Sequence, residues 1–176
     1  MRRISNKNGM SRADQKGSVI VELALMLPVL AIFILGATDL GIIIREHQVL
    51  QNAAREGARF SAQPANQIAP SNPTATANSI RDKVINYLAQ ENITVTASGD
   101  CVLDSTVPQW NCALTNGGTI AIRQQYPIPL GVGGATEDYG SSLAVTYNRS
   151  FLFSGGSLFQ FNSVSLNGNA VFHNLY

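Results

Sequence analysis

An apolar stretch of about 23 residues near the N-terminus, from Ser18 to Leu40, constrains this chain more than any other feature. Its only charged residues are Glu22 near the start and Asp39 near the end. A helix that crosses a bilayer needs roughly 20 apolar residues. A cleaved secretory signal has a shorter apolar region followed by small residues, whereas here the helical pattern continues. The sequence therefore predicts a membrane-spanning helix that is retained.

The segment before this helix is basic, and the rest of the chain is not. Arginine and lysine side chains that flank a membrane helix stay on the cytoplasmic side. We therefore expect a single pass through a membrane, with a cytoplasmic N-terminus and an extracytoplasmic C-terminal domain. Past residue 60 the basic residues are too few for a nucleic-acid-binding stripe, so no nucleic-acid partner is expected. The basic residues of the leader are Arg2, Arg3, Lys7, Arg12 and Lys16, opposed by Asp14.

Glu22 is the residue that an apolar membrane helix should not contain. A carboxylate inside a membrane helix costs about 2.5–3.5 kcal/mol on insertion scales. One explanation is that Glu22 lies at headgroup level and extends into water. Another is that a peptidase cuts after Gly17, so that the new amino group of Ser18 pairs with Glu22 of a neighbouring subunit and fixes their axial register. The residues alone leave both explanations open.

The stretch from Lys16 to Ala62, KGSVIVELALMLPVLAIFILGATDLGIIIREHQVLQNAAREGARFSA, resembles the TadE-like family of minor pseudopilins. Its start also resembles the class III signal sequences that prepilin peptidases cut. The family pattern has a glycine, a glutamate, a leucine-rich helix with a proline, an acidic residue with a glycine, and a segment of small residues. An aromatic residue usually follows the glutamate, where this chain has Leu23. The matching positions are Gly17, Glu22, Pro28, Asp39, Gly41 and Gln51 to Arg59.

The resemblance implies a role in the tight-adherence (Tad, Flp pilus) machinery, which is related to type IV pilus systems. It implies cleavage between Gly17 and Ser18 by a membrane-embedded aspartyl prepilin peptidase. The other implied partners are further pilins and pseudopilins and the inner-membrane pilus assembly platform. The resemblance also implies insertion in the inner (cytoplasmic) membrane, where the action would be helix packing among subunits. The chain would enter the filament, sit at its tip or remain in the membrane.

A different class of function also fits the residues. The helix would then be a passive tether, and the exported domain would be a binding module that captures a ligand, a surface polymer or a partner. Catalysis is not expected, because the chain has only two histidines and no recognisable nucleophile motif. No cofactor and no metal site are expected either, since His47 and His173 are far in sequence from the cysteines.

Residues 18–62 are expected to form one helix, because no proline follows Pro28 until Pro64. Its outer part has a nearly flat side that contains Ala54, Gly57 and Ala58. Such a side allows close backbone approach. It would receive either the globular domain or a helix of another subunit, and simple helix propensity is a third explanation.

The chain as a whole is expected to have an α+β fold, with a pilin-like domain in which one helix packs on an antiparallel sheet. The predicted parts are a leader (1–17), the long helix (18–62), a linker rich in Pro, Asn, Thr and Ala (63–78) and the domain (79–176). Ser79 is the candidate cap of a second helix that ends near Glu91. Alternation and β-branched residues predict strands at 93–97, 119–126 and 143–153, and an edge strand at 164–172 with a turn or bulge at Asn167 and Gly168.

Cys101 and Cys112 are the only cysteines. They are expected to form a disulfide if the domain lies in an oxidising compartment. Closing so short a loop adds about 3 kcal/mol of stability in the chain-entropy model. The alternative is a pair of unrelated buried thiols.

Overall fold

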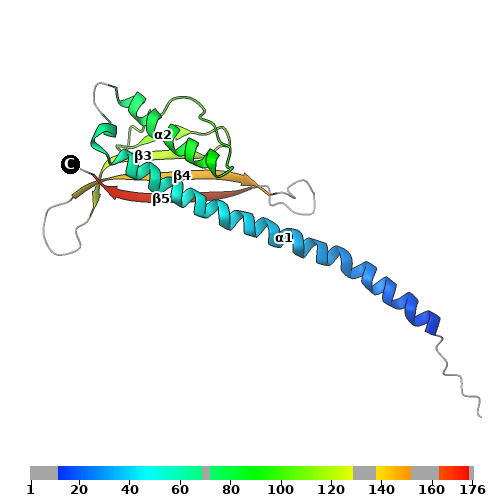
Figure 1. Ribbon diagram of the computed structural model, residues 1–176. Coiled ribbons are helices and arrows are strands. Elements are labelled where there is room, and N and C mark those ends of the chain that lie inside the picture. The colour runs from blue at the N-terminus through cyan, green and yellow to red at the C-terminus, as the bar shows by residue number, and fades with distance from the viewer. Residues whose placement is uncertain (1–11, 69–71, 129–137, 152–162, 175–176) are drawn as a thin grey trace, which may run out of the picture. The chain divides into compact units, whose positions relative to one another are not determined.

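The computed structural model describes residues 12–68, 72–128, 138–151 and 163–174, with the backbone alone for 12–18, 125–128 and 138. The chain divides into two compact units, Met1–Gly41 and Ile42–Tyr176. The first contains the apolar part of helix α1 (Arg12–Ser61), and the second contains the end of α1 and every other element. This arrangement confirms the predicted α+β fold, a long apolar helix followed by a small domain (Figure 1).

Helix α1 is continuous over 50 residues and includes Pro28. Membrane helices tolerate an internal proline because neighbouring groups compensate for the lost backbone hydrogen bond. The helix starts at Arg12, earlier than the expected Ser18, since residues 13–16 are helix-compatible and nothing interrupts them. It ends at Ser61, just before Pro64 starts the short 3-10 helix η1 (Pro64–Asn66). The end agrees with the prediction to within one residue.

The second helix, α2 (Pro73–Gln90), begins earlier than predicted. Pro73 is in the first turn, where its missing N–H costs no hydrogen bond. Ser79 therefore lies inside α2, and its hydroxyl donates to the carbonyl of Ala75 at 3.0 Å instead of capping the helix. The prediction of a cap at Ser79 was wrong because it gave a serine more weight than the Asn72-Pro73 pair. The predicted apolar line of Ile80, Val84 and Leu88 is buried.

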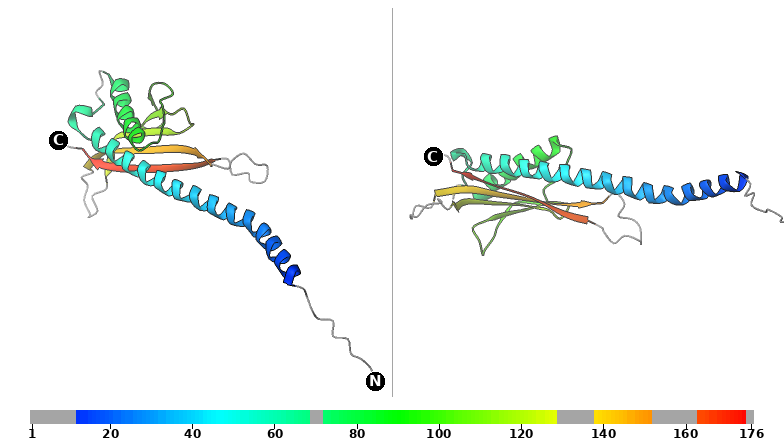
Figure 2. Two further views of the ribbon diagram at one scale, coloured as in Figure 1. Left: turned by 45° about the vertical axis from the view of Figure 1, so that its right-hand side comes forward. Right: turned by 90° about the horizontal axis from the view of Figure 1, so that it is seen from below.

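Five antiparallel strands form one sheet whose spatial order follows the sequence (Figures 1 and 2). The strands are β1 (Val102–Leu103), β2 (Trp110–Ala113), β3 (Thr119–Ile128), β4 (Asp138–Ser150) and β5 (Ser163–His173). Strands β3, β4 and β5 correspond to three of the predicted strands, and β5 is at the edge as predicted. Residues 152 and 153 of the predicted third strand lie outside the described residues.

Two predictions about the strands were wrong. Residues 93–97 do not form a strand, and only Ala97 makes an isolated bridge, to Leu114. Their alternation instead buries Ile93 and Val95 in the core without a partner strand. The expected turn or bulge at Asn167 and Gly168 is also absent, because β5 pairs with β4 in unbroken register through both residues.

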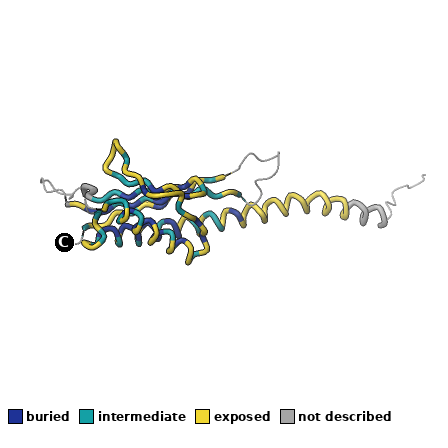
Figure 3. Tube along the Cα trace, turned by 90° about the horizontal axis from the view of Figure 1, so that it is seen from above, coloured by how far each residue is buried: buried dark blue, intermediate teal, exposed yellow. Residues whose placement is uncertain are grey.

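The core of the second unit lies between the sheet and the two helices. The last turns of α1 and the inner face of α2 supply alanine, isoleucine, leucine and valine side chains, and β3 and β4 supply isoleucine, leucine and valine. Burial is concentrated in this unit, as the dark blue segments show (Figure 3). The fully buried large side chains are Leu50, Ile80, Leu88, Ile120, Ile122, Leu143, Val84 and Val145.

Candidate functional site

The first candidate site is the apolar half of α1. Every residue from Val19 to Thr38 is exposed in the chain, and Leu25 and Phe33 keep 70% and 73% of their surface accessible. This part of α1 is long and apolar enough to cross a membrane, and none of its most apolar window is buried within the protein. A helix that is apolar on all sides needs lipid or other helices around it. The first unit therefore fits a single-pass membrane anchor.

The candidate processing and register residues all lie on this helix. Gly17 and Ser18 are within the helical backbone of α1, so the expected cut would fall in a helix. Glu22 is one turn further on and is exposed among apolar neighbours. Gly41 has open space where a side chain would stand, whereas Asp39 keeps only 7% of its surface exposed.

The second candidate site is the flat side of α1 within the second unit. Ala54 and Ala58 are fully buried. A Cβ added to Gly57 would come within 2.5 Å of Val84 Cγ2 and 2.8 Å of Leu143 Cδ1, so α1 needs glycine here to approach α2 and β4. The sequence left open whether this side receives the chain's own domain or a helix of another subunit. In the structure the chain's own domain covers it.

An ion pair that the sequence analysis missed joins the same helix to the sheet. Arg149 Nη1 on β4 donates a hydrogen bond to Glu46 Oε1 on α1, and the two side chains are only 11% and 16% exposed. Burial raises the pKa of the neighbouring Tyr147, and the charge of Glu46 raises it further, against the opposing effect of Arg149. The available signal was Arg149, the single charged residue of the strand predicted at 143–153.

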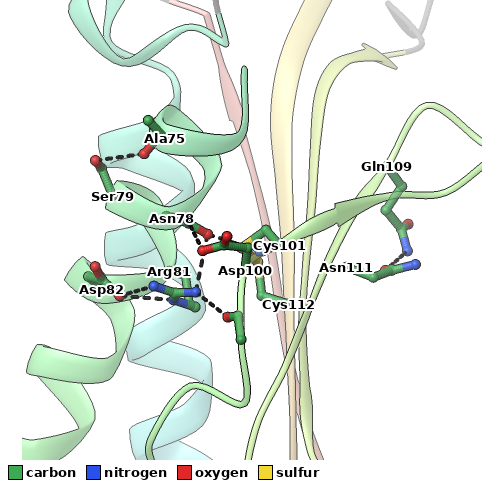
Figure 4. Close-up of a disulfide and its surroundings, with 11 residues drawn as sticks. Ala75, Asn78, Ser79, Arg81, Asp82, Asp100, Cys101, Gln109, Asn111 and Cys112 are labelled. Atoms are coloured by element: carbon green, nitrogen blue, oxygen red, sulfur yellow. Dashed lines mark hydrogen bonds and ion pairs between the residues drawn. A yellow bond between two sulfur atoms is a disulfide. The ribbon is translucent and has the colours of Figure 1, made fainter. Parts of the chain in front are cut away.

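Cys101 and Cys112 form a disulfide with 4.2 Å between their Cα atoms (Figure 4). Helix α2 holds the chain next to it. Arg81 Nη1 donates to the carbonyl of Gly99 at 2.7 Å, and Asn78 Oδ1 accepts from the backbone N–H of Cys101 at 2.9 Å. The β1–β2 hairpin is thus fixed both covalently and by hydrogen bonds from α2.

Nothing in the described part of the chain suggests metal chemistry, since no three His, Cys, Asp or Glu side chains gather there.

Comparison with known proteins shows that most of helix α1 is similar to one family. Residues 17–59 match the family model described as TadE-like protein. The matched segment starts at Gly17, contains Glu22 and ends at Arg59, just past the buried Gly57 and Ala58 of α1. No curated protein matches the chain, and no solved structure does. The match confirms the resemblance inferred from the sequence, and α2 and the sheet lie beyond it.

Proposed function

We propose that this chain, a TadE-like protein over residues 17–59, is a minor pseudopilin that takes part in assembly of a Tad pilus. The family supports involvement in the Tad pilus. The observation that carries the finer proposal is the position of Glu22, an exposed carboxylate on a helix that is otherwise apolar on all sides. In this proposal the chain acts by packing and not by catalysis.

The proposed mechanism starts with cleavage between Gly17 and Ser18 by a prepilin peptidase at the cytoplasmic face of the inner membrane. The freed amino group has a pKa near 8 and is mostly protonated at neutral pH. Glu22 of an adjacent subunit offsets this buried charge, which would otherwise be costly. The pair sets the axial register of neighbouring helices, while the domain remains outside the cytoplasm.

The processing step is tested by expressing the full chain with the prepilin peptidase of its system and sequencing the mature N-terminus. Cleavage should leave Ser18 first in the wild type and should fail in Gly17→Val. Gly36→Val is the matched control, because a Cβ at Gly36 meets nothing within 4 Å. A mature chain that begins elsewhere, or working pili made with the leader attached, contradicts the proposal.

The register step is tested with Glu22→Gln, which removes the charge and keeps the shape of the side chain. We expect normal cleavage and a loss of pili in cells that carry this variant. Leu25→Ala, which trims an exposed apolar side chain on the same helix, should retain pili. Normal piliation with Glu22→Gln would show that the carboxylate has no role in register.

The alternative function is a membrane-anchored binding module with a passive tether. The tight docking of the domain on residues 46–61 of its own helix is compatible with it, because the domain does not need another subunit to cover that side. Replacing residues 19–38 with an unrelated apolar helix of equal length separates the two functions. Piliation should be lost if helix packing is the action and kept if the helix only tethers.

A further inference from the structure

A concavity of about 650 Å³ opens on the helix-covered face of the sheet, just past the end of α1. Its lining includes Gln124 on β3 and also Gln67 and Ile68, which follow η1. Gln124 Nε2 donates to Ser61 Oγ at 2.9 Å, and Gln124 Oε1 accepts from the N–H of Ile68 at 2.6 Å. These bonds join β3 to the end of α1 and to Ile68, so Gln124 holds these three segments together.

The lining combines aromatic and apolar surface. Trp110 lies on β2 next to Leu103 of β1, its cross-strand partner, and Tyr139 lines the concavity from β4. Trp110 is half-buried, while Leu103 and Tyr139 remain 53% and 44% exposed. The disulfide at Cys112 fixes the hairpin that carries Trp110 and Leu103. Aromatic rings that are held in this way offer flat faces to the C–H groups of a ligand.

The polar side-chain groups of the lining are carboxamides, the hydroxyl of Tyr139 and an indole N–H. Among the described residues around the concavity, none is charged. Gln67 is exposed, and neither its carboxamide nor the indole N–H of Trp110 makes a hydrogen bond within the described part of the chain. Asn174 Oδ1 accepts from Ser141 Oγ at 3.1 Å, which orients this amide and leaves its Nδ2 as a donor.

We propose that this concavity binds a short uncharged saccharide, with a sugar ring against Trp110 and hydroxyl groups bonded to Gln67 and Asn174. A saccharide presents an apolar C–H face and a rim of hydroxyls that both donate and accept, which is the combination that this lining complements. Its volume is in the range of about 300–1,000 Å³ that is typical of small-molecule sites. Proline-rich peptides also bind to aromatic-lined grooves, so such a peptide is the competing ligand that the test must include. The site is independent of the role of α1 in pilus assembly.

Trp110 is the only tryptophan of the chain, so its fluorescence reports directly on the site. The full chain is purified in a phosphocholine detergent, because detergents with sugar headgroups would compete. Maltotriose, cellotriose and N-acetylchitotriose are titrated to millimolar concentrations, together with a proline-rich peptide. We expect a saturable change in Trp110 emission with at least one saccharide and none with the peptide.

The variants Tyr139→Ala and Gln67→Ala should each weaken saccharide binding by roughly fivefold to tenfold, the effect of losing a stacking surface or a hydrogen bond. Val171→Ala is the matched control, because Val171 is 47% exposed on β5 and is not part of the lining. The proposal is overturned if no saccharide gives a saturable change, if the peptide alone binds, or if all variants bind as the wild type does.

Discussion

The backbone of Leu50 on α1 lies directly over Gly168 at the centre of β5. A Cβ added to Gly168 would come within 2.4 Å of the carbonyl carbon and oxygen of Leu50 and 2.7 Å of the N of Gln51. Atoms of the helix backbone cannot rotate away as the end of a side chain can. Gly168 is therefore the contact that sets how closely α1 approaches the edge of the sheet.

Replacing Gly168 with alanine should destabilise the second unit. We expect the free energy of unfolding to fall by about 1–3 kcal/mol, because α1 must shift away from β5 and loosen the packing of Leu50. Urea titration of the full chain in phosphocholine micelles, followed by Trp110 fluorescence, measures it. Asn167→Ala, at an exposed neighbouring position, should be close to wild type. Equal stability of Gly168→Ala and wild type would refute the close contact.

Gly168 also illustrates what the sequence could not reveal. The asparagine-glycine pair favours a turn, and only the approach of a helix more than a hundred residues away explains the glycine in an unbroken strand. By contrast, α1 was predictable from its apolar length, and β3, β4 and β5 from alternation. The two-residue β1 and the four-residue β2 are too short to show a pattern.

The candidate site residues differ in the same way in how far the sequence could reveal them. Gly17 and Glu22 were recognisable because their spacing along one helix is a local pattern. The ion pair of Glu46 and Arg149 was not, because the two residues are 103 positions apart and each has an ordinary surface explanation. The concavity beside Trp110 is likewise a product of tertiary structure, since its lining comes from segments that are distant in sequence.

Loss of the disulfide should destabilise the domain without changing its fold. We expect the double variant Cys101→Ser/Cys112→Ala to lose about 3 kcal/mol of unfolding free energy, mainly through a less restricted unfolded chain. The hydrogen bonds from Asn78 and Arg81 should keep the hairpin in place in the folded state. Urea titration with and without reductant measures the effect. Reductant should lower the free energy of unfolding of the wild type and leave that of the double variant unchanged. An equal decrease in the variant would mean that the reductant acts on something other than the disulfide.

Breaking the pair of Glu46 and Arg149 should be costly when one partner is removed. Glu46→Gln or Arg149→Met alone should lower the free energy of unfolding by about 3 kcal/mol, because the remaining charge stays largely buried. The double variant should lose less than the sum of the single losses, by about 1 kcal/mol or more. Glu56→Gln is the control, since Glu56 pairs with an exposed Arg59 and should matter little. Additive losses in the cycle would show that the two charges do not interact.

Asp104 should make the hairpin sensitive to acid. Its carboxylate accepts from the hydroxyl of Thr106 at 2.6 Å and from the N–H of Thr106 at 2.8 Å, and these bonds lower the pKa of Asp104. A lowered pKa means that this stabilisation is present above the unfolded value of about 3.9 and is lost as the pH falls through the folded value.

The variant Asp104→Asn removes the titrating group. The stability difference between wild type and this variant should be constant at neutral pH and should shrink below about pH 4, as the wild-type carboxylate becomes protonated. Urea titrations over a pH series measure that difference. Thr106→Val, which removes only the hydroxyl donor, should shift the acid-sensitive range toward the unfolded pKa. A stability difference that stays the same down to the acid limit would show that Asp104 has an ordinary pKa in both states, and that its bonds to Thr106 do not favour the charged form.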